Sequence, residues 1–196
     1  ASTNQRDPIM TNLPRATLGH IGIYVIDFDP MVDFYTGVLG FRVSDAAKRP
    51  DGSQLAFMSN DPNAHHTLVL FSGRVPDSPS NINQLSLHVD TLDDVRRYWE
   101  VAKNEPRISG IRTTSHGNAW SVYFQDPEDN RIEFYTDTPW HVPQPCGMLI
   151  DLSKSNTELI AETEAQVRAL DGFKSFKDFR VENAKNMGVT DFRLTF

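Results

Sequence analysis

The stretch of residues 114–133 carries three side chains that could do chemistry together. His116 offers an imidazole, Tyr123 a phenol and Glu133 a carboxylate. Residues 120–124 and 131–135 read as two strands joined by a turn, because both runs are rich in β-branched and aromatic residues. Side chains alternate between the two faces of a strand, so we expect the three groups to face one cavity.

The alternation of side chains along its strand places Glu133 at a position where a buried core residue is expected. A buried carboxylate is costly unless it is paired with a positive group or binds a metal ion. The residue by itself leaves two interpretations open, a solvated strand residue and a metal ligand.

The composition limits the kinds of molecule that the chain is expected to bind. The chain has 196 residues, 19 basic and 26 acidic, for a net charge of −7, and no basic block that could neutralise phosphates. It has no run of about 18 apolar residues and no pattern typical of a secretion signal. We therefore expect no nucleic-acid or membrane partner. The single cysteine, Cys146, suits a reducing compartment, and a cytoplasmic location is expected.

The sequence predicts a polar N-terminal arm, residues 1–15, followed by a domain over residues 16–138. The first module, 16–73, begins with a strand at 18–27 and a helix with Asp29 as N-cap and Pro30 at its first position. Gly40 ends that helix. Three strand-like runs follow, at residues 41–44, 54–59 and 65–71.

The pattern restarts in a second module, 82–138, after a Pro/Ser/Asn-rich connector. A strand at 82–90 and a helix opened by Thr91 precede three more strands. Phe34-Tyr35 falls on Tyr98-Trp99 at a shift of about 64 residues. The repeat predicts an α+β fold in which two β-α-β-β-β modules form a curved mixed sheet round one cavity.

A C-terminal extension, residues 139–196, is predicted to be helical. Its apolar residues lie at helical spacing from Leu159 to Leu170 and from Phe173 to Ala184. We interpret these two helices as packing elements, a lid or a dimer brace, without a direct catalytic part.

Gly19-His20-Ile21, followed by Phe34-Tyr35-Thr36-Gly37-Val38-Leu39-Gly40-Phe41, resembles the vicinal oxygen chelate superfamily. That superfamily includes glyoxalase I, fosfomycin and bleomycin resistance proteins and type I extradiol dioxygenases. Residues 114–133 are similar to the extradiol signature, in which a liganding Glu follows a Tyr by ten residues; Asp129 stands where the signature has Gly or Pro. His65-His66-Thr67 resembles a segment of biphenyl-2,3-diol-type enzymes.

The resemblance implies a role for each matching residue. His20 and Glu133 would be metal ligands, His66 would be the acid-base residue, and His116 and Tyr123 would act on the bound substrate. Asn118 and His65 are the candidate substrate-binding residues; shaping a turn and flanking His66 are their alternative, structural roles.

Gln84 occupies the place of the family's second His ligand, about 64 residues after His20. His88 lies on the same strand face but roughly 13 Å further along, so we reject it as a substitute. An amide oxygen is a poorer donor than imidazole to Fe(II) and suits Mg or Mn. The fourth ligand of a glyoxalase would fall at Leu68 or Val69, both apolar. At most three candidate ligands remain, His20, Gln84 and Glu133, which leaves open positions on the metal for a chelating substrate and dioxygen. This arrangement favours a ring-cleaving dioxygenase over a glyoxalase.

The sequence thus predicts an extradiol-type dioxygenase that cleaves a small catechol-type aromatic with dioxygen. Fe(II) is the expected metal, with Mn, Mg or Zn as alternatives, and a homo-oligomer is expected because the superfamily often pairs modules between chains. Two other classes remain open. One is a superfamily isomerase, lyase or hydrolase with a non-iron divalent metal, and the other is a non-catalytic small-molecule binder.

Overall fold

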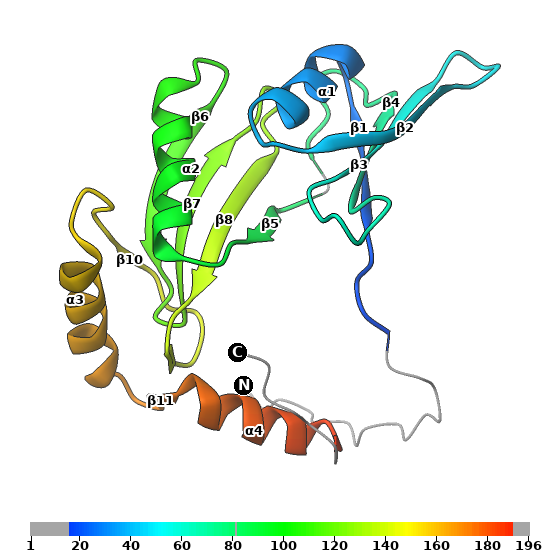
Figure 1. Cartoon of the computed structure of the whole chain (residues 1–196). Coiled ribbons are helices and arrows are strands. Elements are labelled where there is room, and N and C mark those ends of the chain that lie inside the picture. Colours follow the sequence, from blue (N-terminus) through cyan, green and yellow to red (C-terminus); the bar gives the residue numbers. More distant parts are fainter. Residues whose placement is uncertain (1–15, 81, 190–196) are drawn as a thin grey trace.

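The computed structural model describes residues 16–80 and 82–189, which form an α+β fold (Figure 1). The predicted N-terminal arm, residues 1–15, lies outside the described residues. Among the residues described, no helix is both long and apolar enough to cross a membrane.

Both modules have the predicted order of elements. The first contains β1 (Ile21–Val25), α1 (Phe28–Gly37), β2 (Arg42–Lys48), β3 (Gln54–Ser59) and β4 (Leu68–Ser72). The second contains β5 (Leu85–His88), α2 (Leu92–Asn104), β6 (Ser109–Ser115), β7 (Ala119–Gln125) and β8 (Arg131–Asp137).

The strand pairing repeats with the sequence. The first sheet has the order β1-β4-β3-β2, and the second has β10-β6-β7-β8-β5. In each module the first strand runs parallel to the last, with Ile21 opposite Leu68 and Leu85 opposite Ile132, and the other pairs are antiparallel. The predicted fold class is therefore confirmed, with the curved arrangement divided into two hydrogen-bonded sheets.

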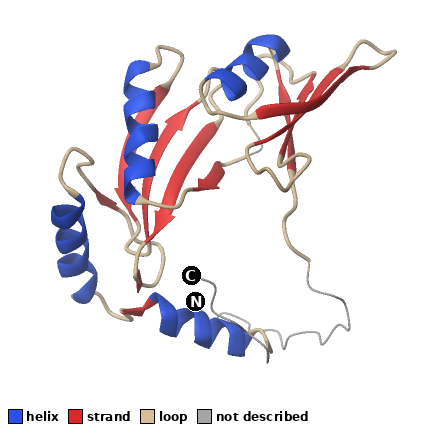
Figure 2. Cartoon of the chain, viewed as in Figure 1, coloured by secondary structure: helices blue, strands red, loops and turns tan. Residues whose placement is uncertain are grey.

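Each module covers one face of its sheet with its helix (Figure 2). Met31, Phe34 and Tyr35 of α1 are fully buried, as is Val95 of α2. Tyr98 of α2 stacks on Phe134 of β8, with ring centroids 3.5 Å apart. These apolar helix faces follow the spacing that the sequence predicts.

Helix α1 begins earlier than predicted. Asp27 is the N-cap, so Asp29 lies in the first turn and Pro30 is the third helical residue. The first N–H groups of a helix have no partner within it, and proline fits at more than one position there. The Asp-Pro pattern thus indicates a helix start without fixing its first residue. Gly40 follows the helix with a positive φ of 77°.

Strand β4 begins later than predicted. His65 and His66 precede it, and pairing with β3 starts at Leu68. The reason is the turn before them, in which Asp61 accepts hydrogen bonds at its side chain from Asn63 and at its carbonyl from Ala64. A β-rich composition alone does not reveal that this turn delays the strand.

The C-terminal extension contains β9 (Trp140–His141), β10 (Met148–Leu149), α3 (Asn156–Arg168), β11 (Lys174–Ser175) and α4 (Phe176–Asn186). Strand β10 joins the second sheet beside β6, and β11 pairs with β9. The indole N–H of Trp120 donates to Thr163 of α3 at 2.9 Å, and both groups are buried. The extension is therefore attached to the second module.

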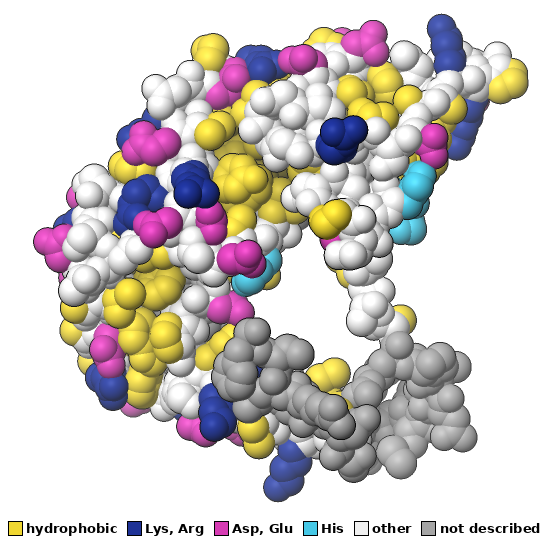
Figure 3. Space-filling model, in the orientation of Figure 1, with side chains coloured by type: hydrophobic (Ala, Val, Ile, Leu, Met, Phe, Trp, Pro, Cys, Tyr) yellow, Lys and Arg dark blue, Asp and Glu magenta, His cyan; other side chains and the backbone are white. Residues whose placement is uncertain are grey.

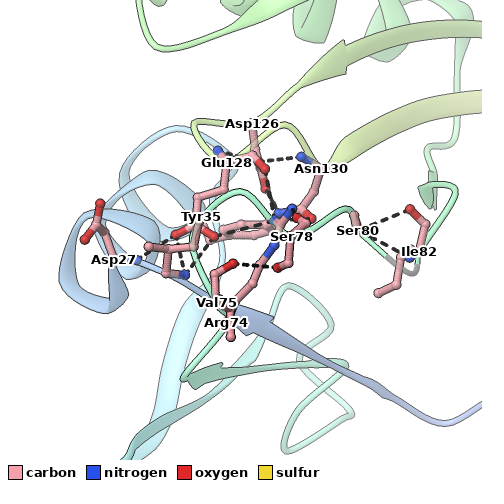
Figure 4. A network of polar contacts seen from close by, with 11 residues as sticks. Asp27, Tyr35, Arg74, Val75, Ser78, Ser80, Ile82, Asp126, Glu128 and Asn130 are labelled. Atoms are coloured by element: carbon pink, nitrogen blue, oxygen red, sulfur yellow. Dashed lines mark hydrogen bonds and ion pairs between the residues drawn. The ribbon is translucent and has the colours of Figure 1, made fainter.

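A buried polar network joins the two modules (Figure 4). The carboxylate of Glu128, in the β7–β8 turn, accepts the backbone N–H groups of Ile26 and Asp27 at 2.8 Å. Close by, the hydroxyl of Tyr35 donates to Asp126 at 3.0 Å. The turn of the second module thus holds the start of α1 in the first.

Arg74, in the connector between the modules, completes this network. Its guanidinium lies 3.8 Å from the Glu128 carboxylate and donates to the Glu128 carbonyl at 3.0 Å. It also donates to the carbonyl of Ser78 at 2.9 Å. Both charged side chains are largely buried, at 12% and 6% exposure, so each needs the other.

Removing the Glu128 carboxylate should destabilise the chain. Glu128→Ala leaves two backbone N–H groups without their acceptor and Arg74 without its counter-charge, and we expect a loss of about 3 kcal/mol in the free energy of unfolding. Urea unfolding measures it. Glu164→Ala is the control, because Glu164 pairs with Arg168 on the exposed surface of α3 and should cost less than about 0.5 kcal/mol. Equal losses in the two variants would show that this network does not hold the modules together.

Candidate metal and substrate site

A cavity of about 670 Å³ opens between the edges of β1 and β5. His20, directly before β1, and Gln84, directly before β5, both line it. The rest of its wall is mainly apolar and includes Ile21, Phe41 and Leu87. Hydrophobic side chains also gather on the face drawn in Figure 3, over the boundary between the modules.

Glu133 of β8 forms hydrogen bonds with two residues that line this cavity, Gln84 and Ser86. Strand β5 runs parallel to β8 with Ser86 opposite Glu133. Glu133 Oε2 accepts Gln84 Nε2 at 2.8 Å and Ser86 Oγ at 2.6 Å, and Oε1 accepts Ser121 Oγ at 2.8 Å. The cavity residue Gln84 and the carboxylate are therefore in direct contact.

The environment of Glu133 is polar but neutral. The residue is only 6% exposed, and its three donors are an amide and two hydroxyls. Across residues 16–80 and 82–189, no lysine or arginine forms an ion pair with it. Hydrogen bonds relieve part of the cost of burying a carboxylate, while its charge stays without a counter-charge.

His66 lies beside His20, with ring centroids 4.4 Å apart, and against Phe57. His65 turns the other way, and its Nε2 donates to Asp45 at 2.9 Å. Its Nδ1 lies 3.0 Å from His66 Nδ1. When both rings are neutral, His65 Nδ1 must accept from His66 Nδ1–H, which leaves His66 Nε2 as a free acceptor. Loss of hydration, with repulsion from His20 and His65, lowers the pKa of His66.

His116 and Tyr123 form a directed pair. His116 Nδ1 lies 2.7 Å from the carbonyl of Cys146, and Nε2 lies 2.7 Å from the Tyr123 hydroxyl. A carbonyl only accepts, so Nδ1 carries the proton and the Nε2 of the neutral ring accepts from Tyr123. Burial raises the pKa of Tyr123, and the negative charge of Glu133 raises it further, so the phenol keeps its proton at neutral pH.

The remaining candidates have structural partners. Asn118 accepts Gln144 Nε2 at 3.3 Å with its side chain and Thr138 N–H at 3.0 Å with its carbonyl. His88 ends β5 and contacts the ring of Tyr135, and its Nε2 lies 4.0 Å from Asp137. The substrate-binding roles of Asn118 and His65 stay predictions.

Among the described residues, no group of three His, Cys, Asp or Glu side chains could hold a metal ion. His20 and Glu133 supply two donors of these types, and a third has to be the amide of Gln84. The ligand roles of all three residues stay predictions.

Sequence reasoning missed the two hydroxyls on Glu133. Ser86 lies two residues after Gln84, and Ser121 lies two before Tyr123. Since strand side chains two apart share a face, the spacing held a signal for both. It also missed the Cys146 carbonyl, which no side-chain pattern marks.

The chain resembles known proteins over both modules. Residues 17–134 match the model of the Glyoxalase/Bleomycin resistance protein/Dioxygenase superfamily. The chain is 30% identical over 133 residues to biphenyl-2,3-diol 1,2-dioxygenase of Paraburkholderia xenovorans (strain LB400), covering 66% of this chain and 40% of that enzyme. It is 29% identical over 136 residues to biphenyl-2,3-diol 1,2-dioxygenase 2 of Rhodococcus globerulus, covering 65% of each. The chain thus spans less than two thirds of either relative.

A solved structure shows the same fold. It is the glyoxylase/bleomycin resistance protein/dioxygenase domain from Frankia sp. EAN1pec, which superposes with a TM-score of 0.54 at 18% identity. The superposition covers 64% of this chain and 100% of that domain. Because the family model matches more than half of the chain, across the modules that carry His20, Gln84 and Glu133, this chain belongs to the glyoxalase/bleomycin resistance/dioxygenase superfamily, that of the vicinal oxygen chelate proteins.

Proposed function

We propose that this chain is a metal-dependent enzyme that cleaves the ring of a small catechol-type aromatic with dioxygen. The superfamily consists mostly of enzymes that use divalent metal ions, and the two curated relatives are dioxygenases of biphenyl-2,3-diol. The observation that carries the proposal is the buried carboxylate of Glu133. It has no positive partner among the described residues and touches a residue of the cavity wall.

The donor chemistry fits a divalent cation. A cation beside Glu133 would supply the missing counter-charge, and His20 and Gln84 line the adjoining cavity. The amide of Gln84 lies 2.8 Å from the Glu133 carboxylate, so turning the amide over would present its oxygen beside the carboxylate oxygen, and both could then serve as ligands. His20, Gln84 and Glu133 would hold the ion.

A metal bound there would supply Lewis acidity, adjacent open positions for two vicinal oxygens and, in the case of iron, redox chemistry. The chain's own residues do the rest. The apolar wall, with Ile21, Phe41 and Leu87, packs against the aromatic ring and excludes water. His66 takes a hydroxyl proton of the substrate at Nε2. The hydroxyl of Tyr123, which donates to His116 Nε2 in the free protein, turns to donate a hydrogen bond to negative charge that develops on the substrate.

One observation favours a second candidate function. An amide oxygen at position 84 is a harder ligand than imidazole and suits Mn or Mg better than Fe(II). With such an ion, the same site would isomerise, cleave or hydrolyse a substrate with vicinal oxygens without dioxygen. A homo-oligomer and a cytoplasmic location also stay predictions.

Metal analysis tests the proposal. Protein purified without chelators should hold about one divalent ion per chain by elemental mass spectrometry. Glu133→Gln should lose most of the metal and gain stability as the metal-free protein, because a buried charge is removed. His88→Ala is the control, since His88 lines the same cavity outside the ligand set. Iron supports the dioxygenase and another divalent ion supports the second candidate. Wild-type protein that holds no metal would contradict both enzymatic functions and favour the non-catalytic small-molecule binder.

Gln84→His should restore an imidazole at the third position. We expect Fe(II) to bind about 10 to 100-fold tighter and the yellow ring-fission product of simple catechols to form faster. Gln84→Ala should lower metal content by a similar factor, and the exposed Gln166→His of α3 should change neither. If both variants at position 84 match the wild type in metal content and activity, Gln84 is not a ligand.

Replacing His66 should separate catalysis from binding. His66→Ala should lower kcat for catechol cleavage by about 10² to 10⁴-fold, as expected for loss of a general base, with substrate binding largely kept. His65→Ala should cost mainly stability, and only about 0.5 kcal/mol, because the pair of His65 with Asp45 is exposed. Steady-state kinetics and titration with substrate in the absence of dioxygen measure the two effects. The opposite pattern would mean that His65 is the base.

A further inference from the structure

His116 is held by a segment outside the two modules. Its Nδ1 donates to the carbonyl of Cys146 at 2.7 Å, and Cys146 lies in the C-terminal extension, beyond the residues 17–134 that match the family. This contact crosses 30 positions of the sequence.

Gln144 ties this segment to the backbone of His116. Its Nε2 donates to the His116 carbonyl at 2.8 Å, and its Oε1 accepts the N–H of Cys146 at 2.9 Å. One side-chain amide thus fixes the distance between the main chain that carries the imidazole and the main chain that carries its acceptor. Gln144 itself is exposed, so it adds little to the apolar core.

The extension also packs closely on the turn after His116. Gly117 has φ +76°, and a Cβ there would lie 2.4 Å from Val142 and 3.1 Å from Val167 of α3. Directly before His116, the end of β6 pairs with β10, with Ser115 opposite Met148. The extension therefore sets where the His116 backbone lies, and the Cys146 carbonyl sets how its ring is turned.

We propose that residues 144–146 position His116 for the reaction and that Gln144 is the positioning residue. A neutral imidazole has two tautomers, and the bond to Cys146 selects the one with its proton on Nδ1. Nε2 then accepts from Tyr123, which fixes the direction of the phenol. The consequence for catalysis rests on the proposed function, whereas the tautomer is a property of the protein alone.

The test uses the full chain labelled with ¹⁵N-histidine. Long-range ¹H–¹⁵N spectra at about pH 8, above the usual histidine pKa of about 6.5, distinguish Nδ1–H from Nε2–H. The His116 signals are assigned by their loss in His116→Gln. Wild-type protein should show His116 as one tautomer, protonated on Nδ1. Gln144→Ala should give a mixture of tautomers, and Gln144→Glu, which keeps only the acceptor for Cys146 N–H, an intermediate mixture.

Gln166→Ala, an exposed glutamine of α3 in the same extension, is the control and should leave the His116 spectrum unchanged. The proposal is overturned if wild-type His116 carries its proton on Nε2, or if Gln144→Ala keeps the wild-type spectrum. In an active preparation, Gln144→Ala should lower kcat for catechol cleavage about tenfold with KM little changed. A tautomer shift in a protein that cleaves no catechol would support the positioning role and refute the proposed function instead.

Discussion

The contact of Glu128 with the start of α1 governs how the modules are placed. The β7–β8 turn of the second module accepts two backbone N–H groups of the first, and Arg74 of the connector neutralises the carboxylate. No strand pair joins β1 to β5 within the described sheets, so their relative position depends on contacts of this kind. The cavity lies between those two strand edges, so its walls belong to the two modules that this contact helps to hold together.

The two buried glutamates of the second module differ in how their charge is balanced. Glu128 and Glu133 are both nearly inaccessible, and both accept several hydrogen bonds. Glu128 has the guanidinium of Arg74 beside it, whereas the donors of Glu133 are neutral. Since a buried ion pair approximately balances its own desolvation and an isolated buried charge does not, Glu128 is explained by architecture alone. Glu133 has no such counter-charge among the described residues, and this difference is the basis for the proposal that it binds a cation.

The sequence predicts the repeat well, because apolar periodicity and the shift of 64 residues report directly on both modules. It predicts less well the ends of helices and strands, which depend on backbone hydrogen bonds in the adjoining turns. The N-cap at Asp27 and the late start of β4 depend on turns whose hydrogen bonds no periodicity shows. For the site, residue types bring His20, Gln84 and Glu133 into consideration. The contact between Gln84 and Glu133 depends on the register of β5 with β8, which exists only once the sheet has formed.

The arrangement of charge and hydrogen bonds argues for chemistry over mere sequestration. A cavity that only holds an apolar guest would be served by glutamine at position 133, which accepts hydrogen bonds without the cost of a buried charge. It would also have no use for an imidazole with a fixed tautomer. In this chain, Tyr123 donates to His116 and His116 donates to the Cys146 carbonyl, a series of hydrogen bonds with one direction that begins at a phenol which burial and Glu133 keep protonated. Such a series commits the phenol proton to His116 next to a buried carboxylate, an arrangement that suits the proposed chemistry on a ligand whose charge changes during its conversion.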